Sequence, residues 1–454
     1  MRKNIRLTVS MICILISLLL VLCSCTGGGV KGIISARIND AGELILIYSD
    51  GTEQNLGSVV GRDGIDGIDG ADGEDGADGE KGENGQDGTT VGGNGDIISS
   101  AISRGLRSSV SIECRFKATV QQGGWWPSSG NTTTKEYASA GSGVIYKLDK
   151  NEGDAFIITN YHVVYDVSSN TKNGISEDIS IYLYGSELDE MAVSATYVGG
   201  SQYYDIAVLR VEDSELLKRS DVCAVAVSDS CDIVIGESAI AVGNAQGLGI
   251  SVTSGIVSVD SEYITMTAAD GKTSISFRVM RVDTAINSGN SGGGLFNDEG
   301  KLIGIVNAKI VYDGVENIGY AIPSDIAISV ANNIIDNCYG TDAESVRKAV
   351  LGVTVTATES KAFFDAETGL ISLAEVVSVY DISDGSPASE VLKKGDMIVS
   401  ASIDGETKKI TRQFHIIDMM LDVRENDTLI LVIIRDGAEM TVSITFDADS
   451  FTAY

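Results

Sequence analysis

The stretch Asp283-Thr284-Ala285-Ile286-Asn287-Ser288-Gly289-Asn290-Ser291-Gly292-Gly293-Gly294-Leu295 places Ser291 among four glycines. Glycine allows the backbone to turn tightly, so the N–H groups of Gly289 and Ser291 can point to one place. Acyl transfer needs a hydroxyl nucleophile beside two such donors, because the attacked carbonyl oxygen becomes negatively charged. The stretch therefore predicts Ser291 as a nucleophile, with the amides of Gly289 and Ser291 as its oxyanion hole.

The residues that follow Ser291 decide between two fold classes. The pattern Gly289-x-Ser291-x-Gly293 also fits the nucleophile elbow of α/β-hydrolases, which requires a helix directly after the serine. Here two apolar runs, 294–296 and 302–306, surround an Asp-Glu-Gly turn instead. This pattern is typical of a β-hairpin and excludes the α/β-hydrolase fold.

The region from residue 96 onward is predicted to be mainly β. Short apolar runs recur at similar spacing between turn residues, and helical periodicity is scarce. Alternation over 110–116 is typical of a half-buried strand, whereas 326–335 predicts a closing helix. The other runs that predict strands are 143–146, 155–160, 179–184, 206–211 and 238–242.

Two histidines, His162 and His415, are the only ones in the chain. So few histidines leave few ways to build a general base near neutral pH. Singly, His162 is typical of a packed core residue and Asp205 of a turn former. In the order His162, Asp205, Ser291, each in an apolar frame, they match a chymotrypsin-type triad. In that arrangement the histidine takes the serine proton and the aspartate orients the ring.

The first 25 residues are typical of an export signal. Arg2, Lys3 and Arg6 precede an almost wholly apolar stretch over 7–22, and Cys25 follows shortly after. The segment resembles a bacterial lipoprotein signal, whose cleavage leaves Cys25 lipid-modified at the new N-terminus. The alternative is an uncleaved membrane anchor of minimal length. Both place the rest of the chain on the extracytoplasmic face of the cell membrane.

Between this signal and the β region lie two further segments. Residues 26–60 predict a short β-rich part with a strand over 43–48. Over 61–90, glycine recurs at every third position from Gly61 to Gly88, ten times without a break. Strict Gly-X-Y repetition is the collagen signature, since only glycine fits the axis of three wound chains. A flexible, acidic linker is an equally supported alternative.

Charge and cysteine content restrict the partners. A net charge of −31 argues against nucleic acid, because neutralising phosphates requires lysine and arginine. No Cys/His cluster has metal-ligand spacing, so neither a metal nor another cofactor is predicted. The cysteines beyond the signal permit either disulfides or buried thiols: Cys114, Cys223, Cys231 and Cys338.

Residues 96–450 resemble the high-temperature-requirement (HtrA/Deg) family of trypsin-like proteases with a PDZ domain. The resemblance implies a chymotrypsin-like double β-barrel over 96–345, with the triad on His162, Asp205 and Ser291. It also implies ATP-independent endopeptidase activity on unfolded or exported proteins, as in protein quality control, and a homotrimer. The matching stretches are 141–145, 159–164, 205–209, 242–244, 252–258, 283–295 and 318–323.

The oxyanion stretch departs from the family pattern. Ser288 and Gly294 stand where prolines or bulkier residues are usual, and Arg281 replaces a usual glutamine. We expect these changes to soften the loop without removing a catalytic group. Asn290 cannot form the ion pair with a newly cut N-terminus that activates digestive proteases. Activation by loop ordering is therefore expected.

The specificity pocket is predicted to be small and uncharged. Ala285 and Ile286 precede the oxyanion stretch, and Ala321 belongs to a nearby motif. No acidic residue occupies the expected pocket base. We expect cleavage after valine, alanine or similar residues, and not after lysine or arginine.

Residues 347–450 resemble a PDZ domain, an α+β module. The matching stretches are 386–388, 392–398 and 435–437. The resemblance implies that Leu351, Gly352 and Val353 capture a peptide's C-terminal carboxylate, and that the next strand pairs with the peptide. His415 is expected on a helix surface. Trp125 and Trp126, in a polar loop, are expected either to touch a neighbouring subunit or substrate or to anchor their own hairpin.

Two other functions fit parts of the chain. One is a catalytically silent, chaperone-like protein that binds peptides. The other is a collagen-like surface stalk or adhesin. The complete set of triad residues argues against the first, and the short extent of the repeat argues against the second.

Overall fold

The computed structural model describes residues 33–39, 43–58 and 94–454, the last range with gaps at 122–131, 187–190, 230–232, 309–317, 342, 344, 365 and 367–369. Contacts divide the chain into two compact units, Met1–Gln86 and Asp87–Tyr454. Outside the described residues lie the predicted signal with Cys25, the Gly-X-Y repeat, both tryptophans and Cys231. Of the helices described, none is both long and apolar enough to cross a membrane.

The first unit contains an antiparallel sheet of three strands, β1 (Ile33–Ile38), β2 (Glu43–Tyr48) and β3 (Glu53–Ser58). β2 is the predicted strand. The turn that follows β2 is fixed by Asp50, whose carboxylate accepts a hydrogen bond from the Thr52 amide at 3.0 Å. This side-chain-to-backbone bond is the usual reason for aspartate in tight turns.

The second unit begins with a helix that the sequence did not predict, α2 (Asn94–Ser108). Ala101 of this helix is buried in the main apolar core. At Gly105 a Cβ would lie 3.1–3.2 Å from Val242 and Phe296, so the helix packs closely on the strands beside it. Its apolar residues are few and form only one narrow stripe. Such a stripe gives a weak helical pattern in the sequence.

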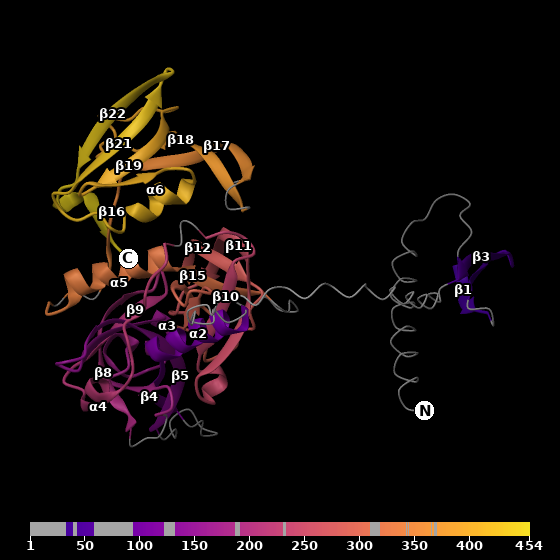
Figure 1. The fold of residues 1–454 in the computed structure, drawn as a ribbon, viewed down its shortest axis with the longest axis horizontal. Helices are drawn as coiled ribbons and strands as arrows, with labels where there is room; N and C mark the ends of the chain where they lie inside the picture. The colour runs from indigo at the N-terminus through magenta and orange to yellow at the C-terminus, as the bar shows by residue number, and fades with distance from the viewer. Residues whose placement is uncertain are drawn as a thin grey trace, which may run out of the picture. The chain divides into compact units, whose positions relative to one another are not determined.

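Two closed barrels of antiparallel strands follow (Figure 1). The strand order is β4-β5-β6-β9-β8-β7 in the first barrel and β10-β11-β12-β15-β14-β13 in the second. The first barrel comprises β4 (Ser109–Gln121), β5 (Thr132–Asp149), β6 (Asp154–Thr159), β7 (Asp178–Leu183), β8 (Val193–Ser201) and β9 (Ile206–Val211). Its connections hold α3 (Tyr161–Val164) and η1 (Lys172–Gly174), and α4 (Glu215–Arg219) follows its last strand.

The second barrel confirms the predicted hairpin after the serine, because β13 and β14 pair antiparallel. Helix α5 (Ser324–Cys338) covers the predicted helical range, and its apolar face joins a core shared with strands of both barrels. The second barrel comprises β10 (Ser238–Gly243), η4 (Ala245–Gly247), β11 (Ser251–Thr267), β12 (Ser274–Val282), β13 (Gly294–Phe296), β14 (Leu302–Val306) and β15 (Gly319–Pro323).

The C-terminal part has its own apolar core and a sheet of order β17-β18-β19-β21-β22, with β20 paired to β19. A separate pair joins β16 to β23. The mainly β fold is therefore confirmed, as a double barrel followed by PDZ-like sheets. This part comprises β16 (Arg347–Ala349), β17 (Val353–Phe364), β18 (Ile371–Ile382), β19 (Met397–Ile403), β20 (Glu406–Lys409), α6 (Gln413–Met419), β21 (Thr428–Arg435), β22 (Ala438–Thr445), η5 (Ala448–Ser450) and β23 (Phe451–Ala453).

A buried arginine links the second barrel to the C-terminal part. The Arg278 side chain on β12 is only 1% exposed. Its Nε donates to Asp418 Oδ2 on α6 at 2.7 Å, and its guanidinium also pairs with Asp325 of α5. The guanidinium carbon lies 4.1 Å from the centre of the Phe414 ring. Charged groups this deep require such partners, because they have lost their hydration.

Burial raises the pKa of Asp418 from its usual 3.8 to about 6, because lost hydration disfavours the carboxylate more than Arg278 favours it. Asp418 therefore contributes stability that is complete below pH 3.8 and is lost as the pH rises through 6. Relative to Asp418→Asn, we expect the wild-type free energy of unfolding to fall by up to about 3 kcal/mol between pH 3.5 and 7.5, at about 1.4 kcal/mol per pKa unit.

Urea unfolding of both proteins across this range would measure the change. Using the difference between the two proteins cancels the carboxylates that do not interact with Asp418. A difference that stays constant, or that grows in favour of the wild type as the pH rises, would contradict the prediction.

Candidate active site

His162 and Asp205 meet because their strands are neighbours. His162 lies on α3 directly after β6, and Asp205 directly precedes β9, which pairs antiparallel with β6. The His162 Nδ1 is 2.7 Å from Asp205 Oδ2. The backbone N–H of His162 also donates to Asp205 Oδ1 at 3.0 Å. One carboxylate therefore fixes both the ring and the backbone of the histidine.

Asp205 is buried, with 3% exposure, and has the left-handed φ of 51°. Such a conformation costs of order 1 kcal/mol and persists only where the surroundings hold it. Its carbonyl oxygen accepts bonds from Asn160 Nδ2 at 2.8 Å and from the Tyr161 amide at 3.2 Å. Its Oδ2 accepts a further bond, from Asn307 Nδ2 at 2.8 Å. Asn307 follows β14 of the second barrel, so both barrels hold this carboxylate.

Ser291 lies on the loop between β12 and β13 and is 5% exposed. At Gly292, φ is 82° and a Cβ would lie 2.2 Å from the Ser142 carbonyl oxygen, so only glycine fits after the serine. The Ala308 amide donates to Ser291 Oγ at 3.3 Å. Among the described residues, no hydrogen bond joins His162 to Ser291. Catalytic hydrogen bonds often tighten only when substrate binds.

The oxyanion turn, residues 287–290, precedes Ser291 and contains one of the two amides predicted to form the oxyanion hole. The Asn290 amide donates to the Asn287 carbonyl at 3.0 Å, and Gly289 has a φ of 95°. A positive φ at the third position defines a type II turn, which differs from type I by a flip of the Ser288–Gly289 peptide. Within the described part of the chain, the Gly289 and Ser291 amides donate to no other protein group. Both N–H groups therefore remain available for a substrate oxygen.

A hydroxyl from the first barrel holds this turn in place. Ser142 Oγ on β5 donates to the Gly289 carbonyl at 2.7 Å. The same oxygen accepts from the Asn244 amide, also at 2.7 Å, and the Ser142 amide donates to the Ser291 carbonyl at 2.9 Å. The oxyanion turn is therefore positioned by contacts across the two barrels.

Sequence reasoning assigned no role to Ser142, Asn160 or Asn307. Ser142 and Asn160 lie inside stretches that matched the family, so their motifs contained a signal. Asn307 follows the apolar run over 302–306, and no spacing or composition distinguishes it from a loop residue. Its role depends on the meeting of the two barrels, which local sequence does not encode.

The predicted specificity residues lie close together, but not all reach the surface. Ala285 is exposed, whereas Ala321 is fully buried in a small core on which Ile286 packs. The Ile286 side chain lies against Gly319, where a Cβ would approach its Cδ1 to 2.5 Å. The region is apolar, as expected, and the pocket itself stays a prediction.

The predicted carboxylate loop borders a cavity of about 240 Å³ between β17 and α6. Leu351, Gly352 and Val353 line one wall, while Ile416 and Met420 line the other. Gly352 has a φ of 77°, and a Cβ there would lie 2.0 Å from that of Ser386. Glycine is thus required at the centre of the loop.

His415 differs from the exposed position expected for it. It lies on α6 but is partly buried, with its ring 4.7 Å from that of Phe414. Burial lowers its pKa, because the charged imidazolium loses hydration there. Phe414 packs toward Arg278, so the helix face that carries His415 is covered more than its sequence pattern suggested.

Of the described cysteines, Cys114 and Cys338 are buried and Cys223 is half-buried, which favours thiols over disulfides. Cys114 and Cys223 are free thiols, and the Cys338 thiol donates to the Ser345 carbonyl at 3.6 Å. Burial raises the pKa of Cys114 to about 12, so this thiol is unreactive near neutral pH.

Comparison with known proteins identifies the family of this chain. A family model described as a trypsin-like peptidase domain matches residues 141–305, a range that contains His162, Asp205 and Ser291. The serine protease Do-like HtrA of Lactococcus lactis subsp. cremoris (strain MG1363) is 34% identical over 363 residues, which cover 76% of this chain and 82% of that protein.

Two further similarities extend over most of the chain. The periplasmic pH-dependent serine endoprotease DegQ of Escherichia coli (strain K12) is 31% identical over 326 residues, covering 69% of this chain and 60% of that protein. The solved HtrA-type protease AlgW with decapeptide is 25% identical, with a TM-score of 0.45, and covers 79% of this chain and 98% of its own. On the identity and coverage of its relatives, the chain belongs to the HtrA family of trypsin-like serine proteases.

Proposed function

We propose that this serine protease cleaves proteins with a triad of His162, Asp205 and Ser291. The observation that carries the proposal is the 2.7 Å contact between His162 Nδ1 and Asp205 Oδ2. A buried carboxylate in this position fixes the ring so that Nε2 faces outward as a base. The type II turn at Gly289 adds the donors that a negative oxygen requires.

The reaction follows from these groups. His162 Nε2 takes the proton of Ser291 Oγ while the oxygen attacks the substrate carbonyl, and the amides of Gly289 and Ser291 stabilise the resulting oxyanion. His162 then gives its proton to the leaving amine, and Asp205 stabilises the imidazolium meanwhile. Water enters and the same steps, run with water as nucleophile, release the acyl group. Neither a metal nor ATP is required.

Regulation acts through the oxyanion turn in this proposal. Asn290 is an uncharged, buried residue whose amide oxygen has no hydrogen-bond partner among the described residues. It offers no carboxylate for an ion pair with a newly cut N-terminus. Ordering of the turn, and not proteolytic processing, therefore activates the enzyme.

The substrates are unfolded or exported proteins, outside the cytoplasm. Support comes from the signal-like segment over 1–25 and from the periplasmic location in the name of one relative. Lipid attachment at Cys25 tethers the enzyme to the membrane, and the Gly-X-Y repeat together with the family resemblance favours a homotrimer. The cavity beside Leu351, Gly352 and Val353 receives the C-terminus of a peptide.

A first test separates the protease from a silent, chaperone-like binder. Ser291→Ala and His162→Ala should each lower the rate of casein cleavage by roughly 10⁴-fold or more, because each removes a group that acts only with the others. Circular dichroism and thermal unfolding would show that both variants remain folded. Cleavage retained in either folded variant would refute the triad.

A second test concerns Asn307, a positioning residue for Asp205. Asn307→Ala removes one hydrogen bond to a charged oxygen, a loss of about 1.5–3 kcal/mol and hence roughly a 10- to 100-fold fall in kcat. KM should change little, since Asn307 Nδ2 is bonded to Asp205 and not to substrate. Rescue by Asn307→Gln or Asn307→Ser would support positioning, and a wild-type kcat in Asn307→Ala would contradict it.

A third test addresses specificity. Mass spectrometry of casein fragments should show cuts mainly after valine and alanine, because the residues near the oxyanion turn are small or apolar. Ile286→Asp should shift cuts toward lysine and arginine, since it places a negative charge beside the pocket. Mostly basic cleavage sites in the wild type would contradict the predicted pocket.

A further inference from the structure

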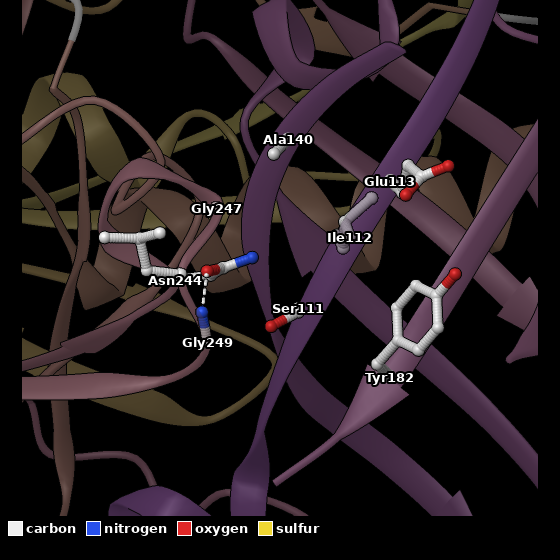
Figure 2. A pocket seen from close by; sticks show the side chains of 9 residues that line it. Ser111, Ile112, Glu113, Ala140, Tyr182, Asn244, Gly247 and Gly249 are labelled. Carbon is white, nitrogen blue, oxygen red and sulfur yellow. Dashed lines mark hydrogen bonds between the residues drawn. The ribbon is translucent and has the colours of Figure 1, made fainter. Parts of the chain in front are cut away.

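A second cavity, of about 330 Å³, lies beside the oxyanion turn and takes no part in the chemistry proposed above. One wall is the outer face of β4, β5 and β7 in the first barrel. The other wall is the segment 244–249, which contains η4 and follows β10 of the second barrel. Figure 2 shows Asn244 and Gly249 on one side of this space and Ser111, Glu113 and Tyr182 on the other.

Strand register places the cavity next to the turn. On the sheet, Ser111 lies opposite Ser142 of β5 and opposite Tyr182 of β7. Neighbouring strands are about 5 Å apart, so Ser111 is one strand spacing from Ser142. Ser142 holds the Gly289 carbonyl at 2.7 Å. The cavity therefore begins about 7 Å from Gly289, which two residues of extended chain would cover.

Two polar side chains in the cavity wall, Ser111 and Asn244, can form further hydrogen bonds. Ser111 is 3% exposed, and its hydroxyl has no hydrogen-bond partner among the described residues. In Figure 2 this hydroxyl points into the space toward Asn244. The Asn244 Oδ1 accepts from the Gly249 amide at 2.8 Å, which leaves the side-chain NH₂ turned toward β4. A buried polar group of this kind is usually satisfied by a ligand or water.

The mouth of the cavity carries one carboxylate. Glu113 lies two residues after Ser111 on β4 and pairs with Ala140 of β5. Its side chain is 31% exposed. It pairs with Arg115 through one oxygen at 2.8 Å. A carboxylate that is bonded at one oxygen still accepts hydrogen bonds at the other. Within the cavity lining, Glu113 is the only charged residue that the structure describes.

The position of the cavity relative to Ser291 assigns it to one side of the substrate. Ala285 and Ile286, predicted to hold the side chain before the cut, do not line the cavity. The Ile286 side chain lies against Gly319 of β15, whereas the cavity adjoins Ser142 of β5. A substrate that crosses Ser291 from the predicted pocket then leaves toward the cavity. The cavity thus faces the part of the substrate that departs as the amine.

We propose that this cavity binds the second residue after the cleaved bond and favours lysine or arginine there. The inference rests on the proposed function and names one feature of its substrates. The Asn244 NH₂ donates to a substrate carbonyl, and the Ser111 hydroxyl accepts from a substrate amide. A long basic side chain then reaches Glu113 at the mouth. An acidic side chain in that position is disfavoured by the same carboxylate.

Two quenched fluorescent peptides would test this on the full chain. They differ only in the second residue after the cut, lysine or leucine, and share a valine before it. A p-nitroanilide with the same acyl side, which has no residues after the cut, reports the triad alone. We expect kcat/KM to be roughly fivefold higher for the lysine peptide, as for a partly exposed ion pair. In Glu113→Gln the ratio should fall to about one.

Matched variants separate this effect from general loss of activity. Glu136→Gln removes an exposed carboxylate from β5 that pairs with Lys117 at 3.2 Å, and it should keep the wild-type ratio. Ser111→Ala should lower both peptide rates relative to the anilide rate, because it removes a backbone contact. Binding of the uncut peptides to Ser291→Ala protein, measured by fluorescence anisotropy, gives a readout that does not depend on catalysis.

The outcomes are distinct. Equal rates and equal affinities for the two peptides, or a preference for lysine that survives in Glu113→Gln, would overturn the subsite. Absence of anilide hydrolysis would count against the proposed function alone, and the anisotropy comparison would then still decide the subsite.

Discussion

The arrangement of the candidate active site depends on the hydrogen bonds to the buried carboxylate of Asp205. A charge at 3% exposure is tolerated only when it is fully paired, because its hydration is lost. Asp205 receives donors from His162 in the first barrel and from Asn307 in the second. The residue is thus satisfied only when both barrels have formed and met. Local folding of either barrel alone leaves this group short of a partner.

Much of the fold was predictable because the apolar residues of its strands and helices follow recognisable patterns in the sequence. The hairpin after Ser291, the strand over 206–211 and the helix over 326–335 each carry a continuous apolar pattern that identifies the element. α2 was missed because its apolar stripe is narrow. His415 was placed on a helix correctly, but its burial was not foreseen, since it depends on Phe414 and Arg278 packing together from distant parts of the chain.

Some residues of the candidate site were predictable from sequence and others were not. Glycine-rich spacing and scarce histidine indicated Ser291, Gly289 and His162, because those residue types are chemically restricted. Ser142 and Asn307 are ordinary residue types, and their importance comes from which atoms they face after folding. Sequence therefore identified the groups that we propose for the chemistry, whereas the residues that contact and hold them emerged only from the fold.

The Ser142 hydroxyl has a consequence for how this enzyme can change. Its hydrogen bonds depend on the spacing of the two barrels, since it donates to the Gly289 carbonyl and accepts from the Asn244 amide. A shift of one barrel by about an ångström would lengthen one of these bonds and loosen the Ser288–Gly289 peptide. Substitutions far from the gap, at any contact that sets the spacing of the barrels, would then tune the rate while every catalytic atom stayed unchanged.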